Sequence, residues 1–246
     1  LVRAGEHGRA AGILEDLLKR HPTAVGYFDT LADIREKTTD FSGVVELYRQ
    51  AMRSVQTDTG LATDEKRGLI ADLRGQLIVR YNRNDMYRES LDQYIEIINR
   101  DPLNEENLLQ AFGHARDHGL LAVLISYYTK TAETSFKDYR FQVVMSRLSE
   151  LSGNLAAAQD YLRKALINEP QRTDLHRRLS DLYLRTRDYD AALASLRSIW
   201  KLTRTADTLF EIARIAGATG RKNDFEWALA EISSTKSPAA GRWFAL

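Results

Sequence analysis

The sequence of 246 residues has no cysteine, only four prolines and 14 glycines. Without cysteine the chain has no disulfide framework, no thiolate ligand for a metal and no cysteine nucleophile. Charged residues interrupt every apolar run well before the ~20 residues that span a bilayer, so we expect no insertion into a membrane. The scarcity of proline and glycine favours a mostly helical chain. The absence of cysteine does not fix the compartment.

The sequence also lacks an excess of charge of either sign. Lys and Arg total 35 against 34 Asp and Glu, which gives a formal net charge of +1. The whole molecule therefore has no overall attraction to nucleic acid or to an anionic membrane. Any electrostatic preference depends on where the charges are placed.

Motifs for catalysis are absent as well. The sequence has no glycine-rich phosphate loop after a strand, no nucleophile elbow and no dinucleotide fingerprint. The adjacent carboxylates Glu105 and Glu106 stand at an expected helix start, where negative charge is favourable without a catalytic task. We expect no enzymatic activity in this chain and no cofactor.

One pattern occurs twice between Tyr139 and Arg204, with a separation of 34 residues. Its first copy is Ser146, Gly153, Asn154, Ala158, Leu162 and Ala165, and its second copy is Ser180, Arg187, Asp188, Ala192, Leu196 and Ile199. A fixed period of this length indicates stacked hairpins of two helices.

The residues within the period indicate which kind of hairpin is repeated. A small residue follows a larger apolar one on the first helix, as in Met145-Ser146, and alanine recurs on the second helix, which Pro170 closes in the first copy. This arrangement resembles the tetratricopeptide repeat, in which small residues let the two helices approach closely. The resemblance covers nearly the whole chain and implies an all-α, right-handed solenoid of antiparallel helical hairpins.

We expect one solenoid domain that is a piece of a longer protein, because both ends read as half hairpins and Leu1 is not a methionine. Residues 240–246, with Trp243, read as a first helix cut short. An insertion at 57–70 is expected to be a surface loop or a lengthened helix pair, capped by Thr63 or Asp64, or a lip over the groove. The repeat units are expected near 1–24, 25–58, 71–104, 105–138, 139–172, 173–206 and 207–239.

Three further patterns leave alternatives open. Tyrosines that recur in register, such as Tyr48 and Tyr128, fit packing between helices better than a stacking platform for bases. His114 and His118 are one turn apart and fit either a metal site or a favourable interaction with the helix dipole. The 36 residues between Ala192 and Ala228 predict two inserted residues in the last turn, at 220–224.

The resemblance also implies a binding groove, because in this family the inner face of the first helices holds segments of partner proteins. In register, the early unit places acidic residues there, including Asp29, Asp33 and Glu36. The residues we expect in the later groove are mostly basic: Asn82, Arg83, Arg116, Arg140, Arg147, Arg177, Asp181 and Arg185. The residues of the family's chaperone-binding clamp are not present at the corresponding places.

Arginine binds carboxylates through two parallel hydrogen bonds, so an acidic peptide segment or a C-terminal carboxylate is the expected partner. The alternative is that these arginines are ordinary solvated charges paired with neighbouring Asp or Glu. We therefore predict a non-catalytic scaffold that binds a partner protein or peptide. A structural spacer or self-association module is the alternative, and the balanced charge disfavours RNA binding.

Overall fold

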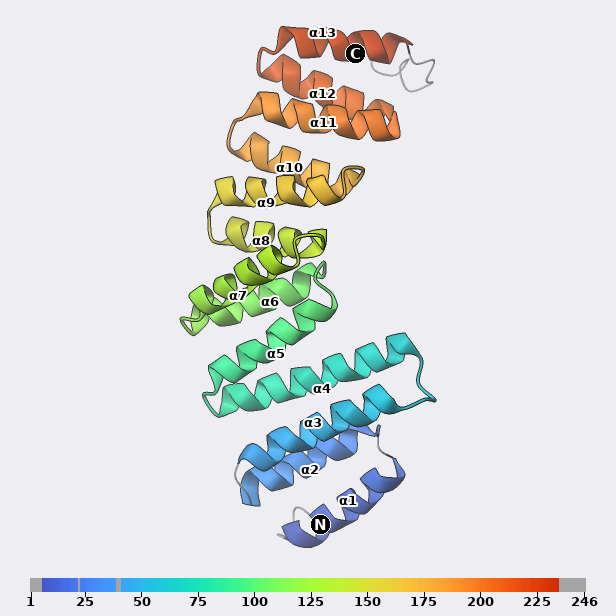
Figure 1. Ribbon diagram of the computed structural model, residues 1–246, viewed down its shortest axis with the longest axis vertical. Helices are drawn as coiled ribbons and strands as arrows, with labels where there is room; N and C mark the ends of the chain where they lie inside the picture. Colours follow the sequence, from blue (N-terminus) through green and yellow to red (C-terminus); the bar gives the residue numbers. More distant parts are fainter. Residues whose placement is uncertain (1–5, 22, 39–40, 235–246) are drawn as a thin grey trace. The chain divides into compact units, whose positions relative to one another are not determined.

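The computed structural model describes residues 6–21, 23–38 and 41–234. Along these ranges the chain forms thirteen α-helices and no strand, which confirms the predicted all-α repeat fold (Figure 1). The expectation for residues 240–246 falls outside the described residues. The chain divides at residues 124 and 125 into two compact units, and each is described by itself.

The first unit, residues 1–124, holds six helices and the start of a seventh. They are α1 (His7–Arg20), α2 (Val25–Thr38), α3 (Phe41–Thr57), α4 (Thr63–Arg83), α5 (Tyr87–Arg100), α6 (Glu105–Asp117) and the beginning of α7 (Leu121–Thr134). From α1 to α6 each helix packs on the next. A core that includes Phe28, Leu31, Leu73 and Tyr81 joins α2, α3 and α4, and Tyr48 is fully buried in it. Its tyrosines thus serve packing, as expected.

The extra residues predicted at 57–70 are mostly helical. Helix α3 continues to Thr57 and α4 begins at Thr63 with a length of 21 residues, so only 58–62 connect the two. The cap prediction was wrong: the residue that precedes α4 is Ala62, which makes no side-chain cap hydrogen bond, and Thr63 and Asp64 lie inside the first turn. The additional sequence lengthens a helix pair and does not form a long loop.

The second unit, residues 125–246, contains the rest of α7 and three complete hairpins. Its further helices are α8 (Tyr139–Leu151), α9 (Leu155–Asn168), α10 (Thr173–Arg185), α11 (Tyr189–Thr203), α12 (Ala206–Ala218) and α13 (Lys222–Ser234). Partners in a hairpin pack together, as α8 does with α9, and each hairpin packs on the next through α9 with α10 and α11 with α12. On α8 the side chains of Gln142 and Met145 are buried.

The turns inside the hairpins share one backbone feature. A residue in the left-handed region, at φ +79° for Gly153 and +61° for Arg187, ends the first helix. The next residue caps the second helix: Asn154 accepts a hydrogen bond from the Ala157 amide at 3.0 Å, and Asp188 does the same for its own helix. Glycine tolerates this conformation without strain, and the cap satisfies a free amide at the helix start.

Close approach of the paired helices depends on the repeated small residues. The Ser146 hydroxyl donates to the Ala158 carbonyl at 2.9 Å, and 34 residues later the Ser180 hydroxyl donates to the Ala192 carbonyl at 3.2 Å. All four residues are buried. A larger side chain at any of these positions would push the helices apart.

The last hairpin departs from the prediction made for its turn. Helix α13 begins at Lys222, so residues 222–224 are helical, and 219–221 form a turn as short as those at 152–154 and 186–188. The turn therefore holds no insertion. Phe225 is the fourth residue of its helix, as Ala192 is, but Phe225 is partly exposed whereas Ala192 and Ala228 are fully buried. The Phe225 ring lies against Gly217, where an added Cβ would be 3.3 Å from it. The missing side chain at Gly217 makes room for this larger residue.

A larger side chain at the contact between α10 and α11 tests how closely these two helices approach. We expect Ala192→Leu to lower the free energy of unfolding by about 2 kcal/mol, because the leucine would enter a buried contact that has no space for it. The measurement is urea unfolding followed by far-ultraviolet circular dichroism. Ala194→Leu, on the exposed side of the same helix, is the matched control and should change stability by less than about 0.5 kcal/mol. Equal effects of the two substitutions would contradict the proposed contact.

Candidate binding faces on the first helices

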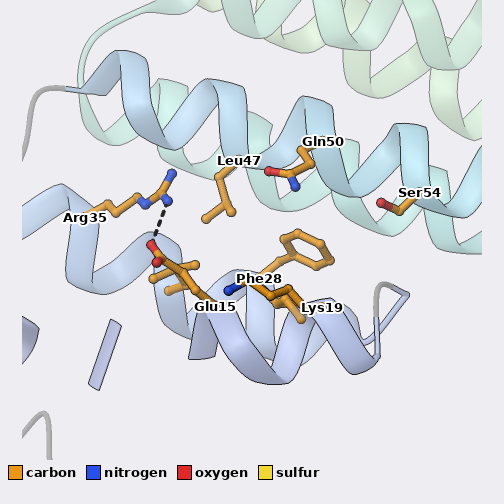
Figure 2. A pocket seen from close by; sticks show the side chains of 9 residues that line it. Glu15, Lys19, Phe28, Arg35, Leu47, Gln50 and Ser54 are labelled. Atoms are coloured by element: carbon orange, nitrogen blue, oxygen red, sulfur yellow. Dashed lines mark hydrogen bonds and ion pairs between the residues drawn. The ribbon is translucent and has the colours of Figure 1, made fainter. Parts of the chain in front are cut away.

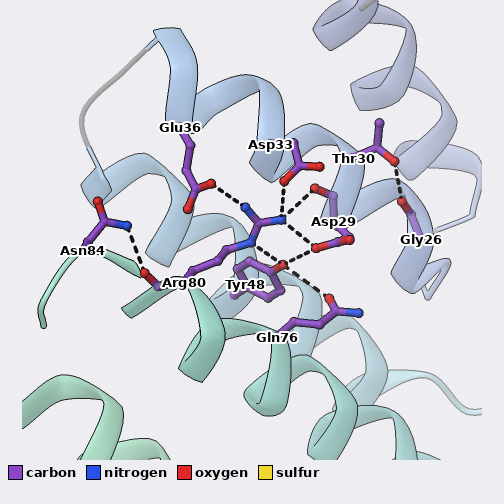
Figure 3. Close-up of polar contacts among 9 residues, drawn as sticks. All are labelled: Gly26, Asp29, Thr30, Asp33, Glu36, Tyr48, Gln76, Arg80 and Asn84. Atoms are coloured by element: carbon purple, nitrogen blue, oxygen red, sulfur yellow. Dashed lines mark hydrogen bonds and ion pairs between the residues drawn. The ribbon is translucent and has the colours of Figure 1, made fainter. Parts of the chain in front are cut away.

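Three acidic residues predicted to line the early groove converge on one arginine. Arg80 of α4 has a side chain only 4% exposed, and it reaches Asp29, Asp33 and Glu36 of α2 (Figure 3). Its Nη2 donates to Asp29 Oδ1 at 2.6 Å and to Asp33 Oδ1 at 2.8 Å, and its Nη1 donates to Glu36 Oε2 at 2.8 Å. The acidic side chains are thus partly neutralised from within the protein.

Tyr48 of α3 completes this cluster. Arg80 Nε donates to the Tyr48 hydroxyl at 2.9 Å, and that hydroxyl donates to Asp29 Oδ1 at 2.9 Å. Burial raises the pKa of the Tyr48 hydroxyl, Arg80 acts against this shift, and Asp29 adds to it. The hydroxyl stays protonated and supplies a donor, so side chains from α2, α3 and α4 form one hydrogen-bonded network.

The position of Arg80 in the sequence carries a signal of this buried network. Arg80 lies three residues after Leu77, and therefore on the buried stripe of its helix rather than on the groove stripe. A charged residue at a core position requires partners, and carboxylates in the neighbouring unit are the partners available. Nothing in the sequence specified which carboxylates would be within reach.

Breaking this network should destabilise the first unit. We expect Arg80→Met to lower the free energy of unfolding by about 2 kcal/mol, because three carboxylates lose a common cation and Tyr48 loses a donor. Chemical unfolding of the whole chain measures the effect. Arg83→Met is the control: Arg83 forms no ion pair with another described residue, and we expect a change below about 0.5 kcal/mol. An unchanged free energy of unfolding in Arg80→Met would show that the network contributes nothing to stability.

The hollows in the described part of the first unit include two that are lined by residues of α2. One, of about 230 Å³, is lined by Asp29, Asp33, Gln76, Val79, Arg80 and Arg83. The other, of about 420 Å³, lies among α1, α2 and α3 and has Phe28, Leu31 and Leu47 in its lining (Figure 2). Arg35 Nη2 pairs with Glu15 Oε1 at 3.1 Å on its wall. The smaller hollow contains the acidic face, whereas the larger one has a mixed lining.

The predicted groove residues of the first unit have separate environments. Arg83 lines the smaller hollow, and the Oδ1 atom of the adjacent Asn82 is buried without a hydrogen-bond partner. Arg116, near the end of α6, donates through Nε to its neighbour Asp117 at 2.9 Å. Their role in a groove stays a prediction.

In the second unit, ion pairs link the first helices of successive hairpins. Arg147 Nη1 donates to Glu150 Oε2 at 2.8 Å within α8, and Arg185 of α10 donates to the other oxygen of Glu150. Arg177 of α10 pairs in the same way with Glu211 of α12. Three of the predicted arginines thus share one face, which we call the first-helix face of the second unit. Arg140, also predicted, binds the adjacent cap residue Asp138.

Two acidic residues on this face have pKa values shifted in opposite directions. Burial alone would raise the pKa of Glu150, but its bonds to Arg147 and Arg185 outweigh this and lower it. Desolvation raises the pKa of Asp181, Arg177 acts against that shift, and Glu211 and Glu150 add to it. Glu150 is therefore a fixed anion that binds two arginines, whereas Asp181 is less strongly held in its charged form.

The ion pairs of Glu150 make the second unit sensitive to acid. The folded pKa of Glu150 lies below its usual value of 4.5, so its contribution is present above pH 4.5 and is lost as the pH falls through the folded pKa. We expect Glu150→Gln to lower the free energy of unfolding by about 1 kcal/mol at pH 7. The difference from the unmodified protein should shrink in parallel urea titrations as the pH is lowered from 4.5 to values below the folded pKa. A difference that persists there would contradict the ionic origin.

The two histidines considered as metal ligands are part of an aromatic cluster. His114 is buried, its Nε2 lies 2.9 Å from the Tyr87 carbonyl, and the ring of His118 stacks on that of Tyr87 with centroids 3.6 Å apart. Burial lowers the pKa of His114, the Tyr87 carbonyl acts against this, and His118 lowers the pKa further. The described part of the chain contains no group of three or more His, Cys, Asp or Glu placed to hold a metal.

Along the described ranges, no helix has both the length and the apolar character that a bilayer span requires.

Stacked antiparallel hairpins, with small residues at their contacts and charged residues across their first helices, define a helical-repeat protein. Residues 151–215 match the family model described as the tetratricopeptide repeat. The matched stretch therefore carries tetratricopeptide repeats, and the resemblance drawn from the sequence is confirmed there.

Solved structures of low identity show a similar arrangement of helices. A structure of MamA is 15% identical, with 65% of this chain and 88% of that chain covered and a TM-score of 0.42. BtubC from P. vanneervenii is 16% identical, with 98% and 89% covered and a TM-score of 0.36. PilF of Pseudomonas aeruginosa is 13% identical, with 100% and 99% covered and a TM-score of 0.39.

These identities and TM-scores are too low to bear on function. No curated protein sequence matches the chain significantly.

Proposed function

We propose that this chain is a non-catalytic scaffold that binds an acidic segment of a partner protein on the first-helix face of the second unit. Tetratricopeptide repeats generally bind protein or peptide partners, which supports the class of function. The choice of partner chemistry rests on the charged residues of α8, α10 and α12.

The observation that carries the proposal is unequal exposure within the ion pairs. Glu150 is 14% exposed, whereas its partner Arg185 is 50% exposed. Glu211 is 28% exposed against 39% for Arg177. The carboxylates are thus the more deeply placed members, and the guanidinium groups face outward. A surface that is balanced in formal charge therefore offers mainly cationic groups to a partner.

An arginine that is already paired can still bind a second carboxylate. A guanidinium has five N–H donors in a planar fork, and one carboxylate occupies two of them at most. An incoming acidic side chain can add to Arg177 or Arg185 while Glu211 and Glu150 hold these side chains in place. Preorganisation of this kind reduces the entropy lost on binding.

Charge reversal tests the proposal. The probe is a fluorescein-labelled peptide of about ten residues that alternates Glu with apolar residues, and the comparison peptide carries Gln in place of Glu. We expect the double variant Arg177→Glu with Arg185→Glu to weaken binding of the Glu peptide at least ~10-fold in fluorescence anisotropy. Binding should also weaken as salt is raised, because exposed charges are screened.

The matched control is Arg163→Glu, an exposed arginine on α9 that pairs only locally with Asp160. It should leave the affinity unchanged, and circular dichroism should show that each variant is folded. Equal binding of the Glu and Gln peptides, or unchanged affinity of the double variant, would refute the acidic partner. Self-association seen by sedimentation without peptide binding would favour the spacer module instead.

A further inference from the structure

Two large apolar side chains in the second unit are unusually exposed. Ile167, near the end of α9, is 79% exposed, and Phe136, between α7 and α8, is 61% exposed. Leu202, near the end of α11, is also exposed. Such side chains would be expected in a core, and their clustering on a surface indicates a contact with another molecule.

The three residues lie at one edge of the second unit. Phe136 lies in the connection α7–α8, whereas Ile167 and Leu202 lie in the last turns of α9 and α11, next to the connections α9–α10 and α11–α12. These three connections lie at the same end of their helices (Figure 1). The side-chain amide of Asn168 donates to the Phe136 carbonyl at 2.7 Å, so the first two connections are in direct contact. Each apolar side chain thus lies in or next to a different one of these connections.

Lysines accompany the apolar residues at this edge. Lys137 follows Phe136 and its Nζ lies 5.9 Å from the centroid of that ring, Lys201 precedes Leu202, and Lys164 lies one turn before Ile167. All three lysines are exposed. The edge comprises Phe136, Lys137, Lys164, Ile167, Lys201 and Leu202, and we call it the connection edge.

Neighbouring charges leave the connection edge positive. Asp138 and Asp174 are neutralised by Arg140 and Arg172. Glu133 and Glu169 oppose the three lysines, while Lys130 and Arg204 add to them. Apolar side chains on successive connections therefore stand in a field that attracts anions.

We propose that the connection edge docks on an anionic lipid surface. Exposed apolar side chains beside lysines match such a surface, because the side chains enter the interfacial region while the lysines stay with the lipid phosphates. Separate side chains suit a membrane, which needs no complementary hollow. A stable dimer of two copies would need roughly 800 Å² on each partner, more than a few side chains on separate connections offer.

Vesicle flotation tests this proposal on the whole chain. We expect binding to vesicles of equal parts phosphatidylglycerol and phosphatidylcholine, and at least ~10-fold weaker binding to phosphatidylcholine alone. Phe136→Ser and Ile167→Ser should each reduce binding about tenfold, because each removes an apolar side chain that enters the lipid interface on binding. Leu109→Ser is the matched control, since Leu109 is an exposed leucine on α6 of the first unit.

A second measurement locates the contact. The chain has no cysteine, so Ile167→Cys and Leu109→Cys each provide a single site for an environment-sensitive dye. Anionic vesicles should shift the emission of the dye at 167 to shorter wavelength and leave the dye at 109 unchanged. Both labelled variants should retain the circular dichroism of the parent.

Several results would overturn the proposal. Absence of flotation, or flotation that Phe136→Ser and Ile167→Ser leave unchanged, would refute it. Dimerisation without lipid that Ile167→Ser abolishes would assign the edge to a second copy instead. The acidic-peptide assay uses the first-helix face, so failure of one proposal is distinguishable from failure of the other.

Discussion

The structure depends on how closely two helices approach at the small residues of each hairpin. In two successive hairpins a serine hydroxyl on the first helix donates to the carbonyl of an alanine on the second, at Ser146 with Ala158 and at Ser180 with Ala192. This contact requires short side chains on both helices. Because helices of 13 to 15 residues are marginal by themselves in water, the contacts within and between hairpins hold each helix in its fold.

Charged residues have two different roles in this chain. Arg80 is buried and binds Asp29, Asp33, Glu36 and Tyr48 in one network. Its positive charge is therefore compensated within the first unit. In the second unit the carboxylate is the more buried member of the pair, because Glu150 is less exposed than its partner Arg185. Ion pairs alike in chemistry thus present different surfaces, according to which member lies closer to the core.

The repeat and the helix class were predictable because they depend on residues close in sequence. The separation of 34 residues, the turn at Gly153-Asn154 and the small residues are local features, and the family match at 151–215 agrees with them. The last turn was misjudged because one alanine, Ala228, was aligned on spacing alone. The structure shows instead that α13 starts at Lys222 and that Gly217 accommodates Phe225.

The sequence by itself determined the kind of hairpin, the places of its turns and the residues that bring its helices together, because i to i+4 spacing and capping act within one or two turns of helix. Only the tertiary structure decided which arginine is buried, which carboxylate bridges two hairpins, and that Phe136, Ile167 and Leu202 share one edge. Those outcomes depend on residues about 30 to 50 positions apart, and their distances are fixed by packing between hairpins, which no local pattern records.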